Sequence, residues 1–369
     1  MTGSQPRSSQ MVEAKPEGSK KKLRCAVVGV GRMGQHHARV YAEMPDVDLV
    51  GVFDSNIDRA GEIAERFRCP VLSTLDAVVD ARPDAVSVAV PTVYHREMAG
   101  PLLEAGIACL IEKPLAQGPE EAEAIKHIAE RSGAMLMVGH IERFNPIMRA
   151  LRRTTAEGMA ITPRFIEVHR VSPMTFRSID IGVVMDMGIH DLDVVIMLMG
   201  GREPDRVEAS GVPVVTEHED LCNARLTWDL PDGQGVCVAN MTFSRLALKT
   251  ERVTRITSED AYIKIDYAKK TGTMIRSVAN ASQMQEVRDL LSQGMDLTSL
   301  KWDDLVNVEP LDVDDGEPIV MEIESFLDSV RSGSRPDIDA EAGLANVRTA
   351  QRIVEAIKAG LPKTPQRVL

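Results

Sequence analysis

Residues 25–38 read CAVVGVGRMGQHHA. The apolar run is followed by Gly29, Gly31 and Gly34 and then by a helical pattern, which predicts a strand, a tight turn and a helix. In this spacing the first glycine permits the turn, the second lets a pyrophosphate approach the backbone, and the third lets the helix pack against the strand. The helix N-terminus offers free N–H groups to the phosphates. Asp54 ends a second apolar strand about twenty residues further along, so the stretch predicts a dinucleotide-binding site.

The composition is that of a globular protein with room for more than one domain. The chain has 369 residues, of which 44% are hydrophobic and 27% are charged. The net charge of −12 argues against nucleic acid or an anionic membrane surface as a partner. No apolar stretch approaches the length of a membrane span, so we expect no membrane partner.

The first 22 residues are rich in Ser, Lys, Gly and Pro and contain no apolar stretch typical of a secretory signal. We expect a disordered tail there. The five cysteines are scattered and form no C-x-x-C pair, which favours reduced thiols in a cytoplasmic protein. The chain has neither an H-E-x-x-H motif nor a Cys/His cluster, so we expect no catalytic metal.

Strand and helix patterns alternate through residues 23–144, which predicts a doubly wound parallel sheet and an α/β Rossmann domain. Six short apolar runs are interpreted as its strands, including a very short one at Val71-Leu72. Ligands of such sheets bind beyond the carboxyl ends of the strands. The residues that fall there are Gly29–Gly34, Asp54, Pro91–His95, Lys113 and His140.

The pattern changes after Asn145-Pro146, and we expect residues 145–369 to form a second domain for substrate binding and oligomerisation. Clean alternation of apolar and polar residues over Leu221–Trp228 and two later runs predicts a largely antiparallel, open sheet. Two helices close the chain, one before Gly333 and one before Gly360. Residues 273–315 are interpreted as polar and irregular. An uncovered apolar sheet face suggests a homodimer or homotetramer.

Asp186 and His190 are four residues apart, so on a helix they share one face and can touch. A carboxylate beside an imidazole orients it and stabilises its charged form, which suits acid–base catalysis. On spacing alone, a capped and partly buried histidine with structural partners is the favoured interpretation. Asp191 and Asp193 can be the solvated side of the same helix.

Lys113 follows a buried strand at the edge where a cofactor would lie, between Glu112 and Pro114. Its ammonium group could polarise a hydroxyl or carbonyl oxygen there, and the following proline could take the cis form. The alternative is an ordinary solvated lysine.

Residues 143–177 contain seven arginines and only two acids, in a chain that is acidic overall. Arginines at this junction could bind a diphosphate group bidentately. The alternative is a basic helix surface around Arg149–Arg153.

Four motifs in this order resemble the Gfo/Idh/MocA oxidoreductases: Gly29–Gly34, Pro91 with His95, Glu112-Lys113-Pro114, and Asp186-x-Gly188-x-His190. The resemblance runs from about Leu23 to Pro362 and implies a Rossmann domain followed by an α/β domain with a large, mostly antiparallel open sheet. It implies NAD as the cofactor, and Asp54 favours NAD over NADP because its carboxylate would repel a 2′-phosphate.

The resemblance also implies roles for individual residues. The catalytic residues would be Lys113, Asp186 and His190, with His190 taking the proton of a sugar hydroxyl. The cofactor-binding residues would be Gly29, Gly31, Arg32, Met33, Gly34, Asp54, Pro91, Thr92, His95, Glu112 and Lys113.

Within the family, residues 139–146 and 177–186 look most like UDP-N-acetylglucosamine 3-dehydrogenases, whose keto product a partner aminotransferase consumes. This implies a nucleotide-sugar substrate, with Arg143, Phe144, Asn145, Arg170 and Arg177 as binding residues. Only Gly182 stands where many members carry a run of glycines before the aspartate. The alternatives are a dehydrogenase of a free cyclitol or sugar and a non-catalytic NAD-sensing regulator.

Overall fold

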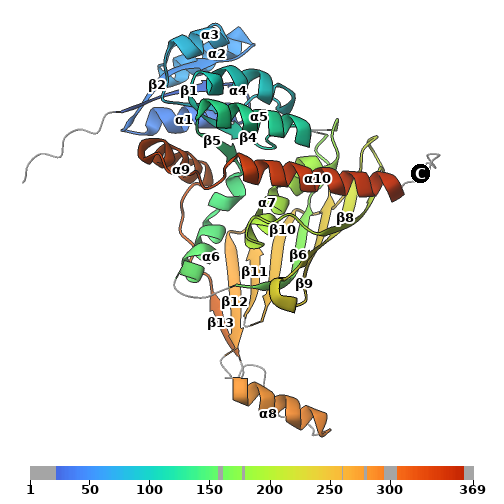
Figure 1. The fold of residues 1–369 in the computed structure, drawn as a ribbon. Coiled ribbons are helices and arrows are strands. Elements are labelled where there is room, and N and C mark those ends of the chain that lie inside the picture. Colours follow the sequence, from blue (N-terminus) through green and yellow to red (C-terminus); the bar gives the residue numbers. More distant parts are fainter. Residues whose placement is uncertain are drawn as a thin grey trace, which may run out of the picture.

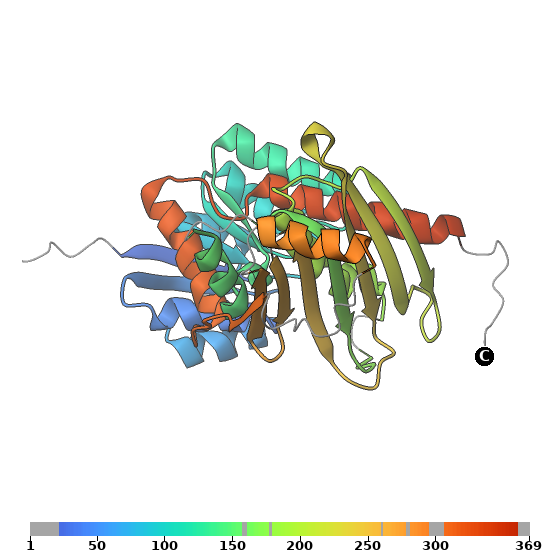
Figure 2. The same ribbon diagram turned by 90° about the horizontal axis from the view of Figure 1, so that it is seen from below.

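The computed structural model describes residues 22–156, 161–176, 179–259, 261–277, 281–294 and 306–360. Two sheets organise these residues, and helices pack around and between them (Figure 1, and Figure 2 from below). The fold is α/β, with a Rossmann sheet followed by a large, mostly antiparallel sheet, as predicted. No helix in the described ranges is long and apolar enough to cross a membrane.

The first sheet has five parallel strands in the order β2-β1-β3-β4-β5. They are β1 (Leu23–Val28), β2 (Val47–Phe53), β3 (Ala85–Val88), β4 (Ala108–Glu112) and β5 (Leu136–Gly139). The crossovers contain α1 (Gly34–Glu43), α2 (Ile57–Phe67), α3 (Leu75–Asp80), η1 (Thr92–Tyr94), α4 (His95–Glu104) and α5 (Pro119–Ser132).

The sixth predicted strand, at Val71-Leu72, is wrong. Val71 forms only an isolated bridge with Val52. Pro70 precedes it and has no N–H to donate, and Thr74 caps α3 through a hydrogen bond to the backbone N–H of Ala77. The segment between them is therefore too short for a ladder.

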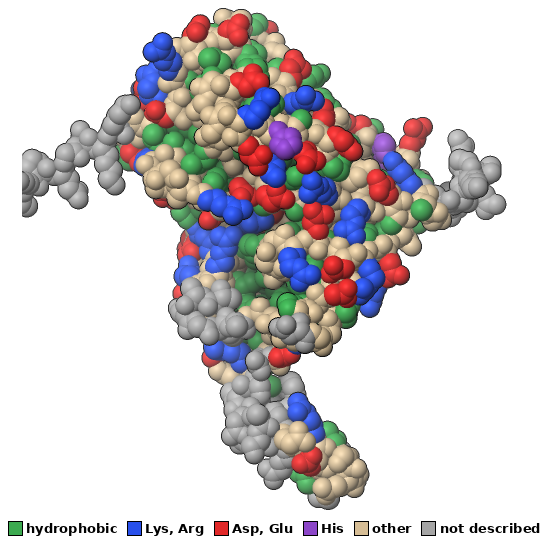
Figure 3. Space-filling model, in the orientation of Figure 1, with side chains coloured by type: hydrophobic (Ala, Val, Ile, Leu, Met, Phe, Trp, Pro, Cys, Tyr) green, Lys and Arg blue, Asp and Glu red, His purple; other side chains and the backbone are tan. Residues whose placement is uncertain are grey.

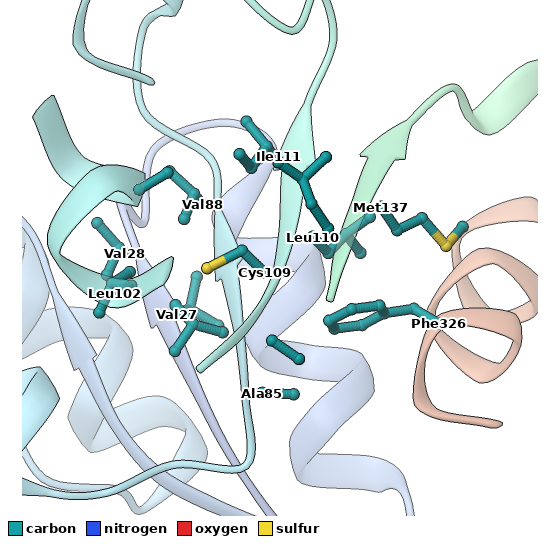
Figure 4. Packing of buried hydrophobic residues seen from close by; sticks show 14 of the residues in the cluster. Val27, Val28, Ala85, Val88, Leu102, Cys109, Leu110, Ile111, Met137 and Phe326 are labelled. Atoms are coloured by element: carbon teal, nitrogen blue, oxygen red, sulfur yellow. The ribbon is translucent and has the colours of Figure 1, made fainter. Parts of the chain in front are cut away.

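The core of the first sheet is built from the continuous apolar runs of β1, β3 and β4, whose residues are buried on both faces. Figure 4 shows Phe326 lying beside Leu110 and Met137 of this core. Phe326 belongs to α9 (Pro318–Ser332), far along the chain. The first core is thus completed by a helix from beyond residue 145.

The second sheet has eight strands in the order β13-β12-β11-β10-β6-β9-β8-β7. They are β6 (Pro163–Val171), β7 (Arg206–Val212), β8 (Leu221–Asp229), β9 (Val236–Ser244), β10 (Glu251–Ser258), β11 (Ala261–Asp266), β12 (Thr271–Ser277) and β13 (Val306–Pro310). Only β6 and β9 pair in parallel. The alternation predicted for β8 is confirmed, because Cys222, Ala224, Leu226 and Trp228 are all fully buried.

Helices cover one face of this sheet (Figure 1). The remaining elements are η2 (Ile141–Phe144), α6 (Pro146–Ala156), the π-helix η3 (Val184–Gly188), α7 (Ile189–Leu198), η4 (Pro231–Gly233) and α10 (Ala340–Gly360). Gly333 ends α9 with φ +69°, as its place in the sequence predicted.

The prediction that residues 273–315 are irregular is wrong for the residues that the structure describes there. They include β12, β13 and α8 (Ala281–Ser292), which projects away from both sheets in Figure 1. β13 is an edge strand, and three of its five residues are exposed, so its sequence lacks the apolar alternation that reveals a half-buried strand.

Candidate functional site

A cavity of about 780 Å³ lies where the carboxyl ends of the parallel strands meet the second sheet. Its first-domain wall includes Arg32, Met33, Glu112, Lys113 and Glu142. Its second-domain wall includes Arg170, Asp186, His190, Arg245 and Arg252. The three residues predicted to be catalytic therefore line one cavity, although they come from two domains.

The glycine turn fits a bound dinucleotide. Gly29 has φ +83°, and a Cβ on Gly34 would lie 1.8 Å from the carbonyl oxygen of Gly29. By contrast, a Cβ on Gly31 would meet no atom within 4 Å. The first and third glycines are required by the fold, and the second leaves open space at the N-terminus of α1. Met33 gives that helix no side-chain cap, so its side chain does not compete with a phosphate for the N-terminal N–H groups.

Asp54 lies directly beside this turn. Its Oδ2 accepts a hydrogen bond from the backbone N–H of Val30 at 2.8 Å, and its Oδ1 accepts one from Asn56 at 2.9 Å. Each carboxylate oxygen keeps acceptor capacity for a ribose hydroxyl. Arg59 also reaches the turn, where its Nε donates to the carbonyl oxygen of Val30.

Pro91 and Thr92 follow β3 beside the glycine turn, because Val90 lies against Gly29. His95 is placed differently from its prediction as a cofactor contact. Its ring is buried between the carbonyl oxygens of Val90 and Leu115, at 3.1 and 3.2 Å. A ligand could reach this ring only by displacing those contacts, so His95 holds the ends of β3 and β4 together.

Lys113 follows β4, and the Lys113–Pro114 peptide bond is cis, the form that the sequence allowed. Burial lowers the pKa of Lys113, and the Glu112 and Asp186 carboxylates oppose that shift. Glu112 itself accepts a hydrogen bond from the backbone N–H of Lys113 and contacts the ring of His37 at 3.1 Å. The ring of His37 is buried.

Asp186 and His190 line the cavity, but the contact predicted between them is not formed. Nδ1 of His190 is buried without a hydrogen-bond partner, and no interaction of its ring with Asp186 is found in the described structure. The turn that joins them is the π-helix η3, not the α-helix that the spacing argument assumed. Asp186 instead lies in the field of Lys113 and Arg245.

The electrostatics of this pair set their protonation states. Burial and the cations Lys113, Arg170 and Arg252 hold the pKa of His190 well below its usual value, so the ring is neutral at neutral pH. Burial raises the pKa of Asp186, while Lys113 and Arg245 act in the opposite direction. A neutral imidazole on the wall of a cavity can accept a proton.

The substrate roles predicted for residues 143–145 do not fit their burial. Arg143 is 6% exposed and donates two hydrogen bonds to Asp193, from Nε at 2.7 Å and from Nη2 at 2.5 Å. Phe144 belongs to the first core, and Asn145 is buried beside Glu142. A charge this deep requires an internal partner, so Arg143 is committed to Asp193.

Arg170 lines the cavity, but its charge is also neutralised inside the protein. It pairs with Asp191 and lies 3.1 Å from Glu142. Burial opposes the charge, yet the two carboxylates raise its pKa above the ordinary value. The sequence allowed Asp191 and Asp193 to lie on a solvated helix face, but both side chains are buried. Arg177 lies outside the described residues.

The other arginines at 143–177 include those of the basic helix surface, which the sequence offered as the alternative to a diphosphate site. Figure 3 shows Lys and Arg side chains gathered over α6. Arg149 and Arg153 of this helix pair with Asp314, and Arg152 lies 3.6 Å from Asp337.

The sequence reasoning missed Arg245 and Arg252, which line the cavity from the end of β9 and from β10. The signal for Arg252 in the sequence was its place two residues before Thr254 and four before Ile256, which are buried on the same face of β10.

Comparison with known proteins agrees with this geometry. Residues 23–140 match the model of the Gfo/Idh/MocA oxidoreductase family with an NAD-binding Rossmann fold, and residues 175–363 match the family's C-terminal α/β domain. An inositol 2-dehydrogenase of Rhizobium meliloti is 32% identical over 52% of this chain and 59% of its own.

A UDP-N-acetylglucosamine 3-dehydrogenase of Acidithiobacillus ferrooxidans is 34% identical over 92% of this chain and 99% of its own. Its solved structure superposes with a TM-score of 0.79, covering 92% of this chain and 98% of that one. Motif order, fold and similarity agree over most of the length, and the chain belongs to the Gfo/Idh/MocA family of NAD-binding oxidoreductases.

Proposed function

We propose that this protein oxidises a hydroxyl of a nucleotide sugar, namely the 3-hydroxyl of UDP-N-acetylglucosamine, to the ketone. The observation that carries the proposal is the meeting of Lys113, Asp186 and His190 in one cavity beside the glycine turn. The similarity to the Acidithiobacillus enzyme over nearly the whole of both chains supports this substrate over a free cyclitol.

The glycine turn would hold NAD, which would supply the acceptor for the hydride from the carbon that carries the hydroxyl. His190 is neutral and takes the hydroxyl proton on Nε2, because its Nδ1 is buried. The ammonium group of Lys113 stabilises the negative charge that develops on the same oxygen. The carboxylates of Glu112 and Asp186 favour the charged form of that ammonium group and oppose the lowering of its pKa by burial.

The test is NADH formation by the purified protein with UDP-N-acetylglucosamine, other nucleotide sugars, inositol and glucose. A glutamate-dependent aminotransferase serves as a trap for the ketone, and we propose such an enzyme as the partner that consumes the product. Turnover with the nucleotide sugar supports the proposal. Turnover with inositol alone would assign the protein to the cyclitol dehydrogenases, and NAD binding without any turnover would favour a regulator.

The matched variants are His190→Asn and His36→Asn, since His36 is exposed on α1. We expect His190→Asn to lower kcat by roughly 10²- to 10⁴-fold with NAD affinity unchanged. His36→Asn should behave as the wild type. Full turnover by the His190 variant would exclude this residue as the base.

We also propose that the protein works in the cytoplasm as a homodimer or homotetramer built through the open face of the second sheet. Val212, Leu221 and Val236 are exposed on the neighbouring strands β7, β8 and β9. Apolar side chains on a sheet face are stabilised by a covering partner. Light scattering of the purified protein, compared with a Leu221→Lys variant, tests this assembly.

A further inference from the structure

Four arginines line the cavity, and two of them are neutralised by internal carboxylates. Arg170 pairs with Asp191 and Glu142, and Arg245 lies 3.0 Å from Asp220. Both of these arginines are buried. Their charges are therefore part of the folded framework and are not available to neutralise a ligand.

Arg252, on β10, differs from both. Its side chain is exposed on the cavity wall, and within the described ranges it makes no hydrogen bond or ion pair. Only its backbone is engaged, through a hydrogen bond that its carbonyl oxygen accepts from Tyr267. A full positive charge therefore faces the cavity that holds Lys113 and His190.

Arg252 faces another arginine across the second sheet. In the antiparallel ladder of β6 and β10, Arg252 stands directly opposite Arg170. Directly opposed side chains lie on the same sheet face, and like charges in that arrangement are destabilising. Asp191, which pairs with Arg170, also lies in the field of Arg252, but no carboxylate forms an ion pair with Arg252 in the described structure. An anionic ligand would therefore relieve the repulsion.

The fourth arginine, Arg32, lies on the opposite side of the cavity. It belongs to the glycine turn, which is the cofactor side, whereas Arg252 belongs to the second sheet. The two exposed arginines thus face the cavity from different domains. This separation favours a second anion distinct from the pyrophosphate of the dinucleotide.

We propose that Arg252 binds the diphosphate of the substrate and so makes the enzyme specific for nucleotide-linked sugars. The inference rests on the proposed function and assigns the role to a residue outside the arginine cluster at 143–177. A guanidinium group can bind two phosphate oxygens with parallel hydrogen bonds. A neutral cyclitol offers this residue no such partner.

The matched pair of variants is Arg252→Gln and Arg255→Gln. Arg255 is on the same strand but has the opposite parity, so it points to the other sheet face, where it stands opposite Glu167. We expect Arg252→Gln to raise the KM for UDP-N-acetylglucosamine by roughly ten- to hundredfold. The KM for NAD should change by less than about twofold, and Arg255→Gln should match the wild type.

Calorimetric binding of UDP to the NAD-saturated protein separates this inference from the proposed function. If wild type binds UDP and Arg252→Gln binds it roughly tenfold or more weakly, Arg252 is the diphosphate ligand even if no nucleotide sugar is oxidised. Equal UDP binding by the Arg252 and Arg255 variants would overturn the inference. So would a loss of NAD binding alone, because Arg252 would then serve the cofactor.

An Arg252→Lys variant guards against a folding artefact. It keeps the charge and loses the two-pronged geometry, so its UDP affinity should lie between those of wild type and Arg252→Gln. Thermal unfolding should give the same midpoint for Arg252→Lys as for wild type. It should give an equal or higher midpoint for Arg252→Gln, which removes the repulsion with Arg170. A Lys variant as weak as Gln, with neither midpoint below that of wild type, shows that geometry decides; affinities equal to wild type in both variants overturn the assignment.

Discussion

The ring of His37 lies 3.1 Å from Oε1 of Glu112, and this contact connects the helix after the glycine turn to the end of the strand that precedes Lys113. The other ring nitrogen lies 3.0 Å from the hydroxyl of Ser87, which lies 2.8 Å from that of Tyr41. All four side chains are buried. The cofactor side of the site is thereby coupled to its catalytic side.

His37→Ala should therefore affect both stability and turnover. Removing the ring leaves the Glu112 carboxylate buried with one partner fewer, so we expect a loss of about 1–3 kcal/mol in unfolding free energy. We also expect a lower kcat, because Glu112 lies next to Lys113. Urea unfolding and steady-state kinetics measure the two effects. His36→Ala, at the exposed neighbouring position, is the control, and equal stability of the two variants would contradict the prediction.

Within the glycine turn, Gly34 is needed for folding and Gly31 for ligand binding. A methyl group at Gly34 would lie 1.8 Å from a backbone oxygen, whereas one at Gly31 would enter open space. Gly34→Ala should lower stability or abolish folding. Gly31→Ala should fold normally and bind NAD more weakly, as the added methyl group occupies the approach to the phosphates. Circular dichroism and NAD titration distinguish the two, and unchanged NAD affinity in Gly31→Ala would refute the assignment.

The Arg143–Asp193 pair makes a quantitative prediction about a residue first assigned to the substrate. Arg143→Met leaves Asp193 buried and unpaired, so it should cost about 3–5 kcal/mol of unfolding free energy. The exposed pair Arg206–Asp229 is the control, and Arg206→Met should cost at most about 1 kcal/mol. If Arg143→Met is as stable as wild type but has a raised KM for the substrate, the first assignment was correct.

Glu322 gives a prediction about pH. Both carboxylate oxygens are buried without a hydrogen-bond partner, and burial, with Glu112 and Asp193 nearby, raises its pKa well above 4.5. Above pH 4.5 the folded chain holds a proton that the unfolded chain has released, so this group makes stability fall as pH rises.

Glu322→Gln removes that titration, so its stability advantage over the wild type should be small near pH 4.5 and grow toward neutral pH. Urea unfolding across this range measures it. Glu324 lies two residues further along the same helix and is exposed, so Glu324→Gln should show no such trend. Parallel pH profiles for wild type and Glu322→Gln would contradict the prediction.

The sequence predicted the fold class because its signals are local. The strand, turn and helix around Gly29–Gly34 depend on neighbouring residues, and so does the alternation along β8. The prediction failed at Val71-Leu72, where one bridge replaced a strand, and at β13, an exposed edge strand. Both segments are stabilised by neighbours elsewhere in the chain and carry little periodicity of their own.

By itself, then, the sequence determined the Rossmann turn, the lysine after β4, the choice of fold and the family motifs. Only the tertiary structure decided which charges are free. Arg143 and Asp193 are 50 residues apart, and Arg170 and Asp191 are 21 apart, yet each pair is buried in contact. A buried charge must find its partner in space and not in sequence, so Arg143 and Arg170, which looked available in the sequence, are neutralised inside the protein. The exposed arginine that lines the cavity from the second sheet is Arg252.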